Sequence, residues 1–161
     1  MEKSVSSGRC RWSLCGVLDL TAAFVVYGFR GAGPIRILQS ITAGLLGADS
    51  YDGGTTTAAL GGILHFVIAF NVTAFYYVLS RKLELLIRQP VLAGILYGPA
   101  VYAFMNLIVL PLSAYPHRIS NKVDLLLAGL IIHIFCVGLP IALVVSGYEK
   151  SRNALYKENF L

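Results

Sequence analysis

The sequence has few charged residues: Asp, Glu, Lys and Arg together make up 13 % of 161 positions. A soluble domain carries about 25 %, so this chain has too few charges to cover the surface of an ordinary soluble enzyme. Apolar residue types reach 57 %, and the mean hydropathy is +0.72. This composition argues against a disordered chain and indicates an integral membrane protein.

Cysteine is scarce as well. Its three residues (Cys10, Cys15 and Cys136) are an odd number, and we expect reduced thiols rather than a disulfide framework. The formal net charge is +5, but no basic stretch is interleaved with aromatic residues, which argues against nucleic acid as a partner. The motifs GxSxG, GxxxxGKS and HExxH do not occur, so the sequence does not predict an enzyme.

Four apolar stretches are long enough to cross a bilayer, which takes roughly 20 mostly apolar residues each. They cover about residues 12–29, 55–80, 91–113 and 123–146. A shorter segment, about 34–46, begins with proline, precedes a glycine and gathers its apolar residues on one arc. This pattern predicts a short amphipathic helix in the outer interface. We therefore expect one all-α membrane domain, residues 1–161, that folds as a bundle of four transmembrane helices.

The positions of Lys and Arg predict how such a bundle is oriented. If the chain weaves through the membrane four times, three cations lie at the N-terminus, three in the loop after the second span and three in the tail. The opposite side then holds four. Cytoplasmic loops carry the excess of Lys and Arg, so both termini are expected in the cytoplasm.

Three ionisable residues, Asp19, His65 and His133, lie well inside the predicted spans, and Asn106 is a strong neutral polar addition. Asp19, His65 and His133 each share a helical face with small residues, which mark the surfaces where membrane helices approach one another. Both histidines are ~15 Å from the outer ends of their spans, and Asp19 is ~10 Å from the cytoplasmic end of its own. Because such groups are costly in hydrocarbon, the sequence predicts an intramembrane polar cluster of Asp19, His65, Asn106 and His133.

Three interpretations of this cluster remain open. In the first, each group hydrogen-bonds a neighbouring helix and fixes its register. In the second, Asp19, His65 and His133 form a proton relay or ion path. In the third, His65 and His133 are the axial ligands of a b-type haem. The sequence favours the first interpretation, so we expect neither a metal nor another cofactor.

Glycine predicts where the helices pack most closely. Gly61 and Gly62 lie on the His65 face of the second span, and Gly94 and Gly98 form a small-xxx-small pair in the third. Larger side chains at such positions push helix backbones apart. We expect all four glycines to line helix–helix contacts.

Two stretches carry a resemblance. GPIRILQSITAGLLGADSYDGGTTTAALGG, with the LHFVIAFNVTAFYYVLSRKL that follows it, and QPVLAGILYGPAVYAFMNLIVLPLSA resemble small hypothetical bacterial inner-membrane proteins with four predicted spans. The resemblance covers about two-thirds of the chain, from Asp19 through Ser113. It implies four spans and a bacterial cytoplasmic membrane, and it brings no assigned activity with it.

The loops between the predicted spans are short and leave no room for a soluble catalytic domain. We therefore expect a structural or accessory integral membrane protein, surrounded by the lipid bilayer, that associates with itself or with a larger membrane complex. The alternative is a small transporter or proton-conducting bundle that uses Asp19, His65 and His133. A haem-binding membrane protein is the third reading.

Overall fold

The computed structural model describes residues 2–116 and 123–160, with side chains for residues 15–116 and 123–154. Every regular element in these ranges is helical, which confirms the predicted all-α class. Three helical segments are long and apolar enough to cross a membrane: Gly54–Ser80, Pro90–Leu112 and Val123–Ala154. A fourth apolar segment, Cys15–Gly28, is shorter.

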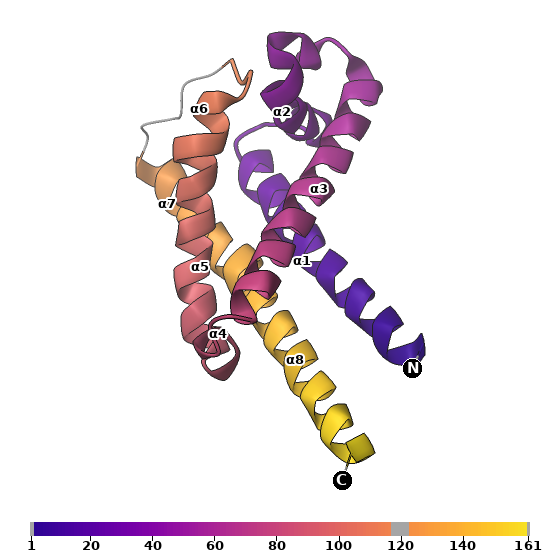
Figure 1. The fold of residues 1–161 in the computed structure, drawn as a ribbon. Coiled ribbons are helices and arrows are strands. Elements are labelled where there is room, and N and C mark those ends of the chain that lie inside the picture. Colours follow the sequence, from indigo (N-terminus) through magenta and orange to yellow (C-terminus); the bar gives the residue numbers. More distant parts are fainter. Residues whose placement is uncertain (1, 117–122, 161) are drawn as a thin grey trace.

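The chain runs back and forth along one direction (Figure 1). Its first half consists of α1 (Glu2–Gly28), α2 (Pro34–Leu46), the 3₁₀ turn η1 (Gly47–Tyr51), α3 (Gly54–Ser80) and the short α4 (Leu85–Arg88). Its second half consists of α5 (Pro90–Phe104), the π-helical turn η2 (Met105–Val109), α6 (Leu110–Leu112), α7 (Val123–Ile132), a second π-helical turn η3 (His133–Gly138) and α8 (Leu139–Phe160).

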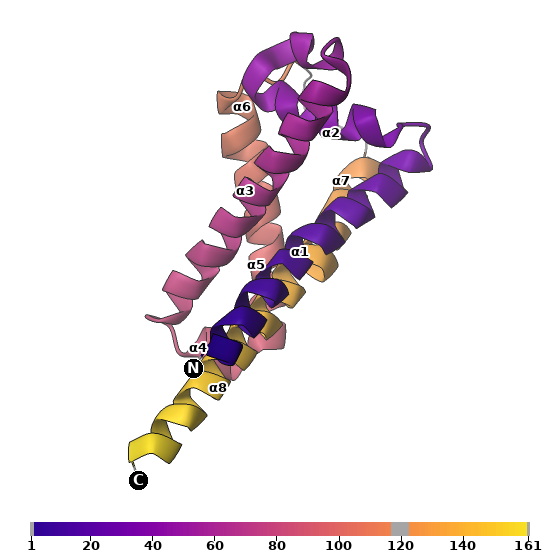
Figure 2. The ribbon, with the colours of Figure 1, turned by 90° about the vertical axis from the view of Figure 1, so that its right-hand side faces the viewer.

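Both chain ends lie at the same end of the molecule as α4, and we call it the terminal end. The opposite end holds α2, η1 and α6, and we call it the α2 end (Figure 1). The view turned by 90° shows α1 running along the last long helix (Figure 2), and α1 contacts both η3 and α8. The order of the long helices is therefore up, down, up and down.

Local signals fix both ends of α2. Pro34 lies in its first turn, where the missing backbone N–H and the fixed φ of proline suit a helix start. Gly47 follows its last residue with a φ of 66° and donates its N–H to the Ala43 carbonyl. A positive φ is readily adopted by glycine. The helix therefore covers the range expected from the sequence.

The buried face of α2 is not purely apolar, as it would be in a helix that only lies in the membrane interface. Its buried residues are Ile37, Gln39, Thr42 and Ala43, and two of these are polar. They bond the first turn of α3: the Gln39 amide donates to the Gly54 carbonyl at 3.0 Å and the Thr42 hydroxyl to the Thr57 carbonyl at 2.7 Å. These bonds direct the polar side chains of Gln39 and Thr42 toward α3, while the apolar Ile35 and Leu45 remain exposed.

The last helix continues well beyond its predicted end. The sequence placed the end of the fourth span near residue 146, closed by Gly147, but α8 runs to Phe160. A single glycine costs a helix only about 1 kcal/mol. Packing around it offsets that cost, because Ser146 and Glu149 are both buried and the Ser146 hydroxyl donates to the Ile87 carbonyl at 2.8 Å.

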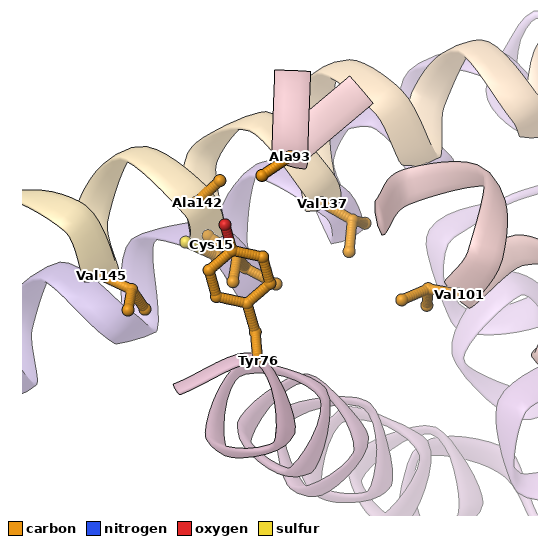
Figure 3. Close-up of a cluster of buried hydrophobic side chains, with 8 residues drawn as sticks. Cys15, Tyr76, Ala93, Val101, Val137, Ala142 and Val145 are labelled. Carbon is orange, nitrogen blue, oxygen red and sulfur yellow. The ribbon is translucent and has the colours of Figure 1, made fainter. Parts of the chain in front are cut away.

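The hydrophobic core gathers around Tyr76 of α3, toward the terminal end. Figure 3 shows its ring reaching from α3 toward Cys15 and Ala142, and the side chain is fully buried. Its hydroxyl donates to the Leu86 carbonyl at 3.1 Å, and its ring meets that of Tyr97 edge-on with the centroids 4.8 Å apart. Tyr76 therefore joins α3 to α4 and to α5.

Candidate functional site

A cavity of about 130 Å³ lies between the helices, and all three predicted ionisable residues line it. Asp19 comes from α1, His65 from α3 and His133 from the start of η3. Most of the remaining wall is apolar, including Ile68, Val101 and Ile141. This volume has room for a few water molecules. The cavity therefore brings together Asp19, His65 and His133 from three different helices.

His65 joins two helices. Its Nε2 lies 2.9 Å from the backbone oxygen of Gly16 on α1. A carbonyl oxygen can only accept, so the imidazole donates this bond through Nε2–H, and in the neutral ring Nδ1 remains an acceptor. Gly16 makes the approach possible, because a Cβ there would lie 3.1 Å from the Phe66 ring and 3.3 Å from Ala69.

His133 bonds within its own helix. Its Nδ1 lies 2.8 Å from the Gly129 carbonyl, so the neutral ring donates through Nδ1–H and keeps Nε2 as an acceptor. The ring centroid lies 5.0 Å from that of Tyr102 on α5. Gly129 leaves space for this tyrosine, since a Cβ at that position would be 2.7 Å from its ring. His133 begins the π-helical turn η3, a backbone feature frequent at functional sites.

Asp19 is the unpaired member of the cavity. Its side chain is half-buried, and it makes no hydrogen bond or ion pair with any residue whose side chain the structure describes. The ionised carboxylate is an acceptor only, whereas the neutral acid can also donate. The cavity therefore combines one carboxyl group with two imidazoles that each have one ring nitrogen outside the bonds described above. Such a set can accept and pass a proton.

Asn106 does not belong to this group, and its assignment to the cluster was wrong. It lies in the other π-helical turn, η2, and does not line the cavity. Its amide donates to the Tyr102 carbonyl of its own helix at 2.9 Å. Because the side chain bonds the preceding turn, it points along its own helix. The predicted cluster residues that line the cavity are therefore Asp19, His65 and His133.

The cavity does not fit the haem interpretation. A b-type haem with two histidine ligands needs one nitrogen of each ring at the iron. The cavity, which has room for a few waters, is far too small for a porphyrin. Among the residues described with side chains, no group of three or more His, Cys, Asp or Glu is placed to hold a metal ion.

Glycine residues allow α5 to pack closely against η3 and the start of α8, next to the cavity. A Cβ at Gly94 would lie 2.8 Å from the Leu139 Cα, and one at Gly98 would lie 2.7 Å from the Ile134 Cα. Gly138 faces them from η3, where a Cβ would lie 2.6 Å from the Gly98 nitrogen. The sequence interpretation missed Gly138, although its place between His133 and Pro140 was a usable signal.

The two glycines of α3 behave differently from each other. A Cβ at Gly61 would overlap the Leu38 carbonyl of α2, so its close neighbour is the short helix α2 rather than another long helix. A Cβ at Gly62 would meet no atom within 4 Å. Among the residues that the structure describes, Gly62 therefore has no close helix neighbour, and its predicted helix–helix contact stays a prediction.

A second polar group was missed by the sequence interpretation. Tyr77 of α3 and Arg81, directly after that helix, meet Glu149 and Arg152 of α8 near the terminal end. No local motif marks these four residues, because about 70 positions separate the two pairs along the chain.

Comparison with known proteins adds no relative: no family model matches the chain, and neither the curated proteins nor the solved structures contain a significant match.

Proposed function

We propose that the chain is a four-span protein of the bacterial cytoplasmic membrane that acts as a structural or accessory component and associates with a second copy of itself. In this proposal the two associated copies can also belong to a larger membrane complex. The contact surface we assign is the outward face of α3 that includes Ala59, Gly62 and Phe66. We expect no catalytic role for this chain.

The four-span architecture rests on the length and course of α1. Its apolar part runs from about Trp12 to Gly28 and extends ~25 Å, close to the roughly 30 Å of a hydrocarbon core. Its course beside the last long helix supports the same arrangement (Figure 2). With four spans, the common position of both termini follows, and the excess of Lys and Arg at the terminal end favours the cytoplasm.

Gly62 carries the association proposal. It is half-buried on α3, between the exposed Ala59 and the exposed Phe66, and a Cβ added to it would meet no atom within 4 Å. Small residues are enriched where membrane helices pack, because they let backbones approach closely. In a two-fold symmetric contact the same residue of both copies comes together. Two Gly62 backbones can therefore approach each other across such an axis.

The low burial of the long helices supports a partner. Of the most apolar 18-residue window in each, 17 % of Gly54–Ser80, 11 % of Pro90–Leu112 and 28 % of Val123–Ala154 is buried by the rest of the chain. Lipid covers such faces in a monomer. A second copy covers part of them in a dimer, and Gly62 of α3 leaves room there for an approaching backbone.

The test is the oligomeric state of Gly62→Leu after reconstitution into lipid nanodiscs or mild detergent. Wild type should be dimeric and this variant monomeric, with unchanged helix content by circular dichroism. Val67→Leu is the matched control, since Val67 is 50 % exposed on another face of α3, and it should remain dimeric. A monomeric wild type, or a Gly62→Leu variant that dimerises as well as wild type, would contradict the proposal.

The cavity favours a second candidate, a proton-conducting bundle. Its supporting observation is the convergence of Asp19, His65 and His133 on one space near mid-membrane. Proteoliposomes that enclose a pH-sensitive dye test it: Asp19→Asn keeps the size of the side chain and removes its acid. Proton flux in wild type that is lost in Asp19→Asn and in His133→Gln supports conduction. Equal dye responses for wild type and empty liposomes eliminate it.

A further inference from the structure

Two arginines from different helices converge on one hydroxyl near the terminal end. Arg81, the residue directly after α3, donates to the Tyr77 hydroxyl at 3.4 Å, and Arg152 of α8 donates to the same oxygen at 3.3 Å. Arg152 also pairs with the carboxylate of Glu149. We call these four residues the arginine cluster.

The arginine cluster carries unbalanced positive charge. Two guanidinium groups lie within hydrogen-bond distance of a single oxygen, and Glu149 is the one carboxylate among the four residues. Each guanidinium has five N–H donors; the bonds described above use one of Arg81 and two of Arg152. The exposed Lys82 and Lys150 are their sequence neighbours. Repulsion between the two arginines falls when an anion lies between them.

The Glu149 side chain holds Arg152 in position from the protein side. It is 2 % exposed, whereas the side chain of Arg152 is 40 % exposed. The Arg81 guanidinium is charged at any physiological pH, and its hydrogen bond to the Tyr77 hydroxyl raises its pKa further. Arg81 and Arg152 therefore both hold charged N–H donors in place. The donors that Tyr77 and Glu149 do not use can bind a ligand.

The surroundings of the arginine cluster are those of a membrane interface. Arg81 follows the last residue of an apolar 27-residue helix. The rings of Tyr77 and Tyr148 meet edge-on there, with centroids 6.3 Å apart, and tyrosine is enriched at the headgroup level of membranes. Phe75 and Val78 of the same helix are 63 % and 58 % exposed. Cationic donors therefore lie next to an apolar surface that acyl chains can cover.

We propose that the arginine cluster binds the headgroup phosphate of an anionic phospholipid, with Arg81 and Arg152 donating to its oxygens. Arginine suits this task because its planar donors match phosphate geometry. The Tyr77 hydroxyl sets the spacing of the two guanidiniums, and the acyl chains lie along exposed α3. Basic sites between transmembrane helices at the cytoplasmic side bind such headgroups. The site is independent of the Gly62 face and of the cavity.

Native mass spectrometry of the full chain tests this with phosphatidylglycerol and phosphatidylcholine at equal concentration. Wild type should retain phosphatidylglycerol preferentially. In Arg81→Gln/Arg152→Gln that preference should fall about tenfold, as expected for the loss of charge-assisted hydrogen bonds. The matched control is Arg88→Gln, since Arg88 is 76 % exposed and pairs with Glu84 on the surface; it should behave as wild type. The preference should also weaken as salt is raised.

Two further measurements keep the result decisive. Arg81→Gln alone leaves the Arg152–Glu149 pair intact, so it folds even where the double variant does not, and it should lose part of the preference. Glycerophosphate, which has the charge without acyl chains, should not raise the thermal midpoint of wild type, whereas phosphatidylglycerol should raise it. Equal stabilisation by both compounds would identify a free-anion site and overturn the lipid assignment. An unchanged phosphatidylglycerol preference in Arg81→Gln would overturn the role of the cluster.

Discussion

The imidazole of His65 and the backbone carbonyl of Gly16 lie 2.9 Å apart, and their hydrogen bond joins α3 to α1 beside the cavity. Both residues are needed for it. Gly16 has no side chain to keep α3 away, and a side chain there would meet Phe66 and Ala69. His65 then supplies a donor to a helix carbonyl, which fixes the register of the two helices.

Replacing His65 by leucine should lower the free energy of unfolding. The loss should be about 0.6–2 kcal/mol, the range for interhelical hydrogen bonds in membranes, and reversible unfolding in mixed micelles measures it. Asn71→Ala is the control, because the exposed Asn71 amide bonds only its own helix at the Val67 carbonyl, 2.8 Å away. Equal losses in the two variants would show that the α1–α3 bond adds nothing.

Replacing Gly98 by alanine should destabilise the contact between α5 and η3. The added Cβ would meet the backbone of His133 and Ile134, and overpacking of this kind costs about 1–3 kcal/mol. Thermal unfolding in detergent measures the change. Gly28→Ala is the matched control, since no atom lies within 4 Å of a Cβ at that position. A neutral Gly98→Ala variant would contradict the packing described for these helices.

Replacing Thr42 by valine should loosen α2 from α3. The change keeps the shape of the side chain but removes the donor to the Thr57 carbonyl, and the loss of such a hydrogen bond costs about 0.5–1.5 kcal/mol. Faster proteolysis between α2 and α3 reports the detachment. Ser40→Ala should have little effect, because the Ser40 hydroxyl bonds its own helix at the Ile37 carbonyl. Identical cleavage rates for wild type and Thr42→Val would refute the anchoring of α2.

Local sequence signals predicted a large part of this fold. Pro34 and Gly47 mark the ends of α2 because their backbone preferences act within a single turn. The common face and similar depth of His65 and His133 predicted that they could meet Asp19. Helical periodicity and membrane thickness supply that geometry without any knowledge of the helix neighbours.

The features that depend on tertiary contacts were not predictable in this way. The inward turn of Gln39 and Thr42 depends on carbonyls in the first turn of α3. The continuation of α8 past Gly147 depends on burial of Glu149. Gly62 lies next to Gly61 in the sequence, but the helix turns by about 100° between them, so only one of the two faces α2.

Topology reporters test the four-span arrangement separately from association. A reporter after Leu161 and one inserted after Arg88 should both read cytoplasmic, and one inserted at Asp52 should read external. An N-terminal tag should be protected from protease added outside the cell, because α1 crosses the membrane in this arrangement. An N-terminal tag cleaved from outside, with the other three reporters unchanged, would reduce the number of spans to three.

Disulfide cross-linking at residue 62 tests the central claim most directly. The measurement uses native membranes and a variant without Cys10, Cys15 and Cys136, into which Gly62→Cys or Val67→Cys is introduced. Under mild oxidation, Gly62→Cys should form a covalent dimer in high yield and Val67→Cys only a trace, because the α3 faces of two copies meet at Gly62. Equal yields at the two positions, or no dimer at residue 62, would contradict association through this face.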